Sequence, residues 1–178
     1  MRPKTVATTY LLIGALLAAF VAMLLAVVSA TPVPVVQGVA LIQPVVALVL
    51  LTGIVFVLMV AYRNLALIRR AVSLRYFQTY AVDTPDERVE RPARAYMNLL
   101  ELPVLFYAVC LLMLTTGTVD SIQVSLAWAF VAARYAHAFI HIGFNYVPLR
   151  FTAFLAGAVT LAVIWTRFAG QNLNWPLS

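Results

Sequence analysis

The stretch VVQGVALIQPVVALVLLTGIVFVLMVAY, residues 35–62, carries no charged side chain and ends at Arg63. A helix that crosses a bilayer core of about 30 Å needs roughly 20 apolar residues, so this stretch is long enough to span a membrane. The whole 178-residue chain is similar, with 64% hydrophobic residues, 10% charged residues and a mean hydropathy of +0.97. A soluble domain carries about 45–50% apolar and about 25% charged residues. The composition therefore excludes a soluble enzyme, a nucleic-acid-binding module and a disordered tail.

Four further stretches have spanning length and are mostly apolar: residues 10–30, 102–119, 121–146 and 151–168. The turns between the last three are short, so we expect these three spans to be antiparallel neighbours. Only helices and closed barrels satisfy every backbone hydrogen bond in lipid. We therefore predict an all-α membrane protein, with a four-helix transmembrane bundle in residues 33–178 and one extra N-terminal transmembrane helix in residues 1–32.

The N-terminal span has two interpretations. Arg2 and Lys4, the apolar run and the small residues at 28–30 resemble a cleavable signal peptide. The apolar run is longer than that of a usual signal peptide, and the charge pattern fits a helix that is kept. We favour a retained helix, and cleavage stays open as the alternative.

The charges indicate a membrane topology. Twelve Lys and Arg residues outnumber six Asp and Glu residues, and most of the arginines lie between Arg63 and Arg94. Short loops rich in Lys and Arg stay on the cytoplasmic side of a membrane. We therefore expect the N-terminus and the 63–94 loop to be cytoplasmic, with residues 117–120 outside, and we expect no nucleic-acid partner.

Polar residues inside the spans are costly and are functional candidates. Their spacing predicts two polar helix faces, one with Arg94, Asn98 and Glu101 and the other with Arg134, His137, His141 and Asn145. Glu101 is seven residues past Arg94, and Arg134 is thirteen residues past Ser121. At a rise of 1.5 Å per residue, both are expected at the same depth in a bilayer core of about 30 Å. We therefore predict a buried Glu101–Arg134 pair, and we favour a functional cavity over a pair that only fixes helix register.

Other kinds of site have little support. His137 and His141 are four residues apart, but two histidines without a nearby carboxylate pattern are a weak metal signal, and we expect no metal. The sequence contains no glycine-rich phosphate loop, Cys/His cluster or nucleophile elbow. The single cysteine, Cys110, excludes an internal disulfide and is interpreted as a small buried apolar residue.

Residues 87–103 read ERVERPARAYMNLLELP and are followed by VLFYAV. This stretch resembles the signature of the MAPEG family, the membrane-associated proteins in eicosanoid and glutathione metabolism, whose pattern is close to ERxxRAxxNxxExxP. The resemblance continues with AWAFVAARYAHAFIHIGFNYVPLRF, residues 127–151, and covers about residues 38–170. The sequence is most similar to the bacterial branch, relatives of microsomal glutathione transferase and microsomal prostaglandin E synthase.

The resemblance implies a homotrimer in a bacterial inner membrane, with one glutathione site at each subunit interface and a lipophilic second substrate. By position it assigns glutathione binding to Arg63, Arg94, Asn98, Glu101, Arg134 and His141, and the catalytic role of thiolate stabilisation to Arg150. A thiol with a pKa near 8.5 is mostly protonated at neutral pH, and a guanidinium in a low-dielectric pocket favours the reactive thiolate. The predicted function is a glutathione-dependent transferase or peroxidase for lipophilic electrophiles.

Two departures from the family leave alternatives open. Phe151 and Phe154 stand where the prostaglandin synthase has a serine and a tyrosine near the thiol, which argues against that isomerase chemistry. The missing hydroxyls favour a second hypothesis, a non-catalytic MAPEG-like scaffold or lipid-binding protein. A third hypothesis, a transporter that relays protons through Glu101 and the histidines, has less support because the sequence lacks broken helices and repeat symmetry.

Overall fold

The structure is a computed structural model that describes residue 22 and residues 37–80 and 85–173. In these ranges every regular element is a helix: α2 (Val39–Ile68), α3 (Leu74–Thr79), α4 (Glu87–Thr116), α5 (Ser121–Ile142) and α6 (Val147–Asn172). The expected all-α architecture is therefore confirmed for the described residues. The expected N-terminal helix at residues 10–30 lies outside them, apart from Ala22.

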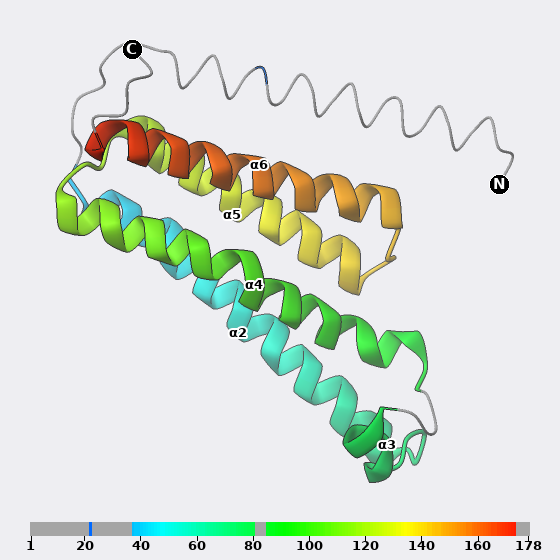
Figure 1. Cartoon of the computed structure of the whole chain (residues 1–178). Helices are drawn as coiled ribbons and strands as arrows, with labels where there is room; N and C mark the ends of the chain where they lie inside the picture. The colour runs from blue at the N-terminus through cyan, green and yellow to red at the C-terminus, as the bar shows by residue number, and fades with distance from the viewer. Residues whose placement is uncertain (1–21, 23–36, 81–84, 174–178) are drawn as a thin grey trace, which may run out of the picture.

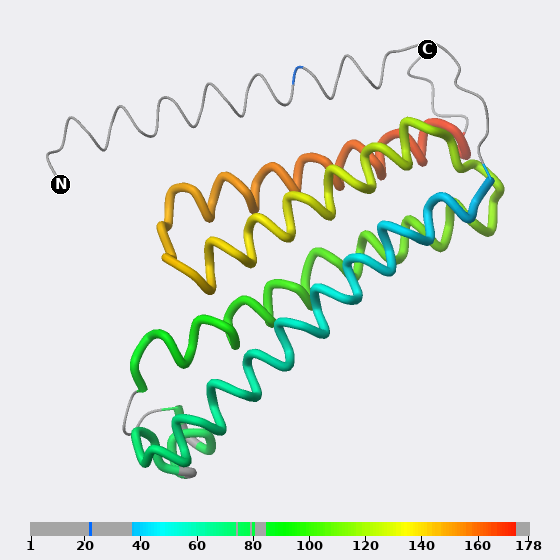
Figure 2. Tube along the Cα trace, turned by 180° about the vertical axis from the view of Figure 1, so that it is seen from behind, coloured from blue at the N-terminus to red at the C-terminus, as the bar shows by residue number. Residues whose placement is uncertain are grey.

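The four long helices run antiparallel in chain order, as Figure 1 shows. The most extensive packing joins α5 to α6 and α2 to α4, so the bundle consists of two helix pairs. Both views show the two pairs close together near the α4–α5 turn and farther apart at the opposite end (Figures 1 and 2). We call these the closed end and the separated end; the separated end holds the start of α4 and the α5–α6 turn.

The core between the helices is built from large apolar side chains. Leu48 of α2 and Phe106 of α4 are fully buried, and the Phe106 ring stacks on Phe130 of α5 with ring centroids 4.7 Å apart. Outside this core, many large apolar side chains of the long helices are exposed, among them Ile54, Leu111 and others on α2 and α4. Among the described residues, three helices, α2, α4 and α6, are long and apolar enough to cross a bilayer. An exposed apolar surface of this kind fits lipid contact.

The helix ends differ from the expected ones. α2 continues past Arg63 to Ile68, and α4 begins at Glu87, so the part of the signature before Arg94 is helical rather than part of the 63–94 loop. The start of α4 is fixed by Asp86, whose side chain accepts a hydrogen bond from the backbone N–H of Arg88. α5 ends at Ile142, and Asn145 has a φ of 49°, so the prediction that Asn145 continues the polar face of a helix is wrong.

The closed end is held by a polar cluster of Asp120, Gln123, Arg167 and Gln171, in which Asp120 and Gln123 are buried. Asp120 caps α5 in a capping box with Gln123. Its Oδ2 also accepts hydrogen bonds from Nη2 of Arg167 at 2.7 Å and from Nε2 of Gln171 at 2.9 Å. This closed-end cluster ties the α4–α5 turn to the last turns of α6.

Candidate functional site

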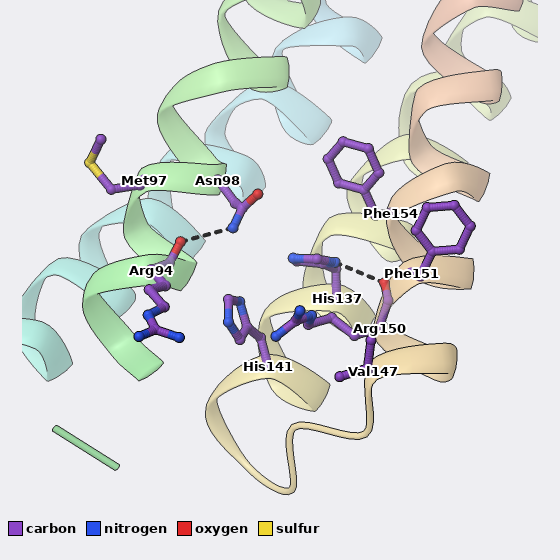
Figure 3. A pocket seen from close by; sticks show the side chains of 9 residues that line it. All are labelled: Arg94, Met97, Asn98, His137, His141, Val147, Arg150, Phe151 and Phe154. Carbon is purple, nitrogen blue, oxygen red and sulfur yellow. Dashed lines mark hydrogen bonds between the residues drawn. The ribbon is translucent and has the colours of Figure 1, made fainter. Parts of the chain in front are cut away.

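A cavity of about 480 Å³ lies at the separated end, between α4, α5 and α6 (Figure 3). It is lined by cationic, polar and apolar side chains, namely Arg94, Met97, Asn98, His137, His141, Val147, Arg150, Phe151 and Phe154. Pockets that bind small molecules usually measure about 300–1,000 Å³ and combine apolar walls with a few polar groups. We call this cavity the arginine pocket.

The α4 wall of the pocket follows from helical spacing. Arg94, Met97 and Asn98 are three and four residues apart, so they share one face of α4. The Asn98 side-chain N–H donates to the backbone carbonyl of Arg94 at 2.9 Å, which fixes the amide against its own helix (Figure 3). The predicted polar face of α4 is therefore correct for Arg94 and Asn98.

Arg150 comes from the first turn of α6. Proline is well tolerated in the first turn of a helix, and Pro148 stands there, just after the start of α6 at Val147. The Arg150 guanidinium points from α6 toward His141 (Figure 3). Its Nη1 donates to the side-chain oxygen of Asn145. Arginine stays charged at every physiological pH, and backbone N–H groups at a helix start add positive potential. The pocket therefore suits an anion.

His137 presents a hydrogen-bond acceptor to the same pocket. Its Nδ1 lies 3.1 Å from the backbone carbonyl of Arg150, and a carbonyl accepts only from a donor, so this nitrogen carries the hydrogen. Nε2 is then an acceptor, and it is buried without a hydrogen-bond partner among the described residues. The His141 ring is edge-on to it, with centroids 5.6 Å apart.

A comparison with sequence models of protein families matches residues 41–170 to the MAPEG family. The chain belongs to the MAPEG family. The match covers every residue that lines the arginine pocket, and MAPEG proteins are membrane proteins that use glutathione as a cosubstrate and include glutathione-dependent transferases. Searches of curated proteins and of solved structures found no match to the chain.

The structure brings together four of the residues that the MAPEG resemblance assigns to glutathione chemistry. Arg94, Asn98, His141 and Arg150 all line the arginine pocket. Met97 and His137 also line the pocket, although the MAPEG resemblance assigned neither of them to glutathione binding. A signal for both was present, because Met97 shares the α4 face of Arg94 and His137 is one turn before His141.

Arg134 lies behind the pocket wall rather than in it. Its side chain is fully buried, and Nη2 donates to the backbone carbonyl of Phe154 at 2.9 Å. The guanidinium carbon is 5.0 Å from the centre of the Phe154 ring and 5.5 Å from that of Phe130, which is cation–π distance. Nε and Nη1 have no hydrogen-bond partner within the described part of the chain.

The predicted Glu101–Arg134 pair does not form in this chain. Glu101 is exposed, and in the described ranges it makes no ion pair. Counting the helical rise predicts the depth of a residue but not the direction in which its side chain points. Arg134 turns toward α6, whereas Glu101 points out of the bundle, so the prediction was wrong.

Arg63 lies in a different cavity of about 420 Å³, formed by α2 and α3. One of its guanidinium nitrogens is 3.6 Å from the Glu90 carboxylate, and the guanidinium carbon is 5.3 Å from the centre of the Phe77 ring. Within one chain, Arg63 therefore does not share a pocket with Arg150. As for metals, no group of three or more His, Cys, Asp or Glu side chains in the described ranges could hold an ion.

Proposed function

We propose that this MAPEG protein is a glutathione-dependent membrane transferase or peroxidase of the bacterial branch, acting on lipophilic electrophiles. The observation that carries the proposal is the arginine pocket, where the Arg94 and Arg150 guanidinium groups line one cavity with apolar side chains. Glutathione is anionic, and its reactive thiolate is a second anion. A pocket with two permanent cations and apolar walls can bind both the glutathione tripeptide and a lipophilic second substrate.

Arg150 is the catalytic residue in this proposal. It stabilises the thiolate, so the thiol loses its proton near neutral pH. The thiolate then attacks the electrophilic atom of the second substrate, a new bond forms at sulfur, and the leaving group departs with its electron pair. The apolar side chains of Phe151 and Phe154 lie on the same wall and would contact the lipophilic partner.

Two of the remaining assigned residues, Arg63 and Glu101, act through assembly of the subunits in this proposal. We propose a homotrimer in which Arg63 of a neighbouring subunit holds a glutathione carboxylate, since Arg63 and Arg150 lie in separate cavities of one chain. Glu101 is exposed on α4, where an interface site can use it for the glutathione ammonium group. Arg134 supports the pocket from behind, through its contacts with Phe154.

We propose that four helices of the described chain span a bacterial inner membrane. α5 is less apolar than α2, α4 and α6, but its costly side chains Arg134, His137 and His141 are buried against the other helices. The basic 63–94 segment and the separated end would face the cytoplasm, where Lys and Arg accumulate. The second substrate would reach the pocket from the lipid.

The thiolate itself provides the test. Glutathione added to purified protein is expected to produce the ultraviolet absorbance of a thiolate, and Arg150→Ala is expected to abolish it. Arg88→Ala, an exposed arginine outside the pocket, is the matched control and keeps the signal. The proposal fails if the wild-type protein shows neither the thiolate absorbance nor saturable glutathione binding.

One observation favours a second candidate, a non-catalytic MAPEG scaffold or lipid-binding protein. Phe151 and Phe154 line the pocket and offer no hydroxyl near the place of the thiol. In that case Glu101→Gln would disrupt assembly of the oligomer, while addition of glutathione would change neither the thermal stability nor the absorbance of the protein. Size measurement of the purified variant distinguishes the two candidates.

A further inference from the structure

We propose that Asn145 and Glu87 are positioning residues that hold the Arg150 guanidinium in the arginine pocket without neutralising its charge. The consequence for the thiolate rests on the proposed glutathione function, whereas the positioning itself does not. Neither residue lines the pocket, and the MAPEG resemblance assigned neither of them to glutathione binding.

A continuous chain of side-chain contacts carries this inference. Arg150 Nη1 donates to Oδ1 of Asn145, and the Asn145 side-chain N–H donates to Oε1 of Glu87. The other carboxylate oxygen of Glu87 accepts from Nη2 of Arg91 at 3.2 Å. Arg91 in turn donates through Nη1 to the backbone carbonyl of Gly143 at 2.8 Å. The start of α4 is thus joined to the α5–α6 turn and to Arg150.

The backbone of the α5–α6 turn places the Asn145 amide between the two helices. Asn145 adopts a φ of 49°, in the left-handed region that asparagine tolerates better than most residues. Its backbone N–H donates to the carbonyl of Ile140 at 2.8 Å, which closes the end of α5. The side chain can then reach Glu87 on one side and Arg150 on the other, and both Asn145 and Arg150 are half-buried.

The neutral Asn145 amide lies between the Glu87 carboxylate and the Arg150 guanidinium, and this arrangement determines the charge of the pocket. The Asn145 amide is neutral, so it binds one edge of the guanidinium and leaves the positive charge of Arg150 for a ligand. The Glu87 carboxylate is balanced by Arg91 instead. A carboxylate in direct contact with Arg150 would cancel the attraction for an anion, because opposite charges a few ångströms apart compensate each other. The amide therefore fixes the guanidinium and preserves its charge.

The positioning can be tested without glutathione. Phenylglyoxal modifies free guanidinium groups, and mass spectrometry of the modified protein gives the rate at Arg150. Asn145→Gly removes the side chain while keeping a backbone that accepts a positive φ, so the turn is preserved. We expect Asn145→Gly to raise the labelling rate of Arg150 about tenfold and Glu87→Ala to raise it about threefold, as expected for lost charge-assisted hydrogen bonds. An unchanged rate in Asn145→Gly would overturn the proposal.

Conservative variants separate positioning from general damage. Glu87→Gln keeps an oxygen that accepts from Asn145, so we expect a labelling rate close to wild type, and Arg88→Ala on the same turn of α4 gives the matched control. If Glu87→Gln and Glu87→Ala label alike, Glu87 does not act through its hydrogen bond.

The thiolate absorbance tests the statement about charge. Asn145→Asp places a carboxylate in contact with the Arg150 guanidinium. We expect this to raise the pKa of the bound glutathione thiol by about one unit, which is about a tenfold loss of thiolate at neutral pH. An unchanged thiolate fraction in Asn145→Asp would overturn the charge argument. If wild type forms no thiolate, the proposed function fails, and the labelling rates still decide the positioning.

Discussion

At the scale of single residues, Gly157 and Arg134 are in the tightest contact found at any glycine that the structure describes. A Cβ atom on Gly157 would lie 2.6 Å from Nη2 of Arg134 and 3.0 Å from its Nε. The arginine is fully buried and bonded to the carbonyl of Phe154, so it has little room to move aside. The missing side chain at 157 is thus what allows a guanidinium to lie against α6, behind the arginine pocket.

Gly157→Ala is expected to lower the free energy of unfolding by about 1–3 kcal/mol, as an overpacked interior does. It should also weaken glutathione binding, because the displaced guanidinium moves Phe154. Thermal unfolding in detergent and a binding titration measure the two effects. Gly170→Ala is the matched control in the same helix, because its Cβ would meet nothing within 4 Å. Equal stability of the two variants would contradict the argument.

Single residues were predicted well where one helix carries the whole pattern. Arg94 and Asn98 share a face of α4 because their spacing alone decides it. The Glu101–Arg134 pair failed because it depends on how two helices are rotated about their axes. Such rotations come from packing, for example from the space at Gly157, and the depth of a residue contains no information about them.

At the scale of elements, the closed-end cluster caps the start of α5 and joins it to the last turns of α6. Asp120 is 3% exposed and bonds to Arg167, Gln171 and the backbone N–H of Gln123. Burial raises the pKa of Asp120, but the hydrogen bonds from Arg167, Gln123 and Gln171 outweigh it and hold the pKa below its ordinary value of 3.8. The carboxylate therefore stabilises the folded state when it is ionised.

The sign of the pH effect follows from this lowered pKa. The contribution of Asp120 is fully present above the pKa of the unfolded chain, near pH 4, and is lost as the pH falls through the lower pKa of the folded state. Asp120→Asn should cost about 3 kcal/mol at neutral pH, because it removes the buried negative charge that faces Arg167, and the difference from wild type should shrink below about pH 4. Thermal unfolding between pH 3 and pH 7 measures this. A constant difference across that range would exclude the role of the charge.

The elements themselves were predictable, whereas their ends were not. Apolar length located α2, α4 and α6, because lipid-spanning segments are continuous in the sequence. The polar start of α4 was expected to be a loop, yet a cap at Asp86 and the Glu87–Arg91 pair extend the helix into it. The end of α5 depends on the left-handed Asn145, which hydrophobicity does not reveal.

At the scale of the whole molecule, the two helix pairs leave Arg63 and Arg150 in separate cavities. If each glutathione site combines them, the two arginines must come from different copies of the chain. Arg63→Ala and Arg150→Ala would then each inactivate a pure oligomer. In a mixed oligomer, however, an Arg63→Ala subunit can supply Arg150 and a neighbouring Arg150→Ala subunit can supply Arg63, which gives an intact site.

Co-expression of the two variants is therefore expected to restore part of the thiolate signal, close to one third or less of wild type by random mixing. The measurement uses differently tagged subunits, purified through both tags in sequence. Mixed oligomers without any signal would show that both arginines act within one chain, and the interface proposal would be wrong.

The divergence of the two pairs from the closed end has a mechanical consequence. With 30 residues, α4 is about 45 Å long, so a tilt of one degree about its closed end displaces the other end by about 0.8 Å. The two helix pairs are joined near the closed-end cluster around Asp120, so a change of the angle between them has its largest effect at the separated end. A small change in packing at the closed end would therefore change the width of the arginine pocket at the opposite end of the bundle.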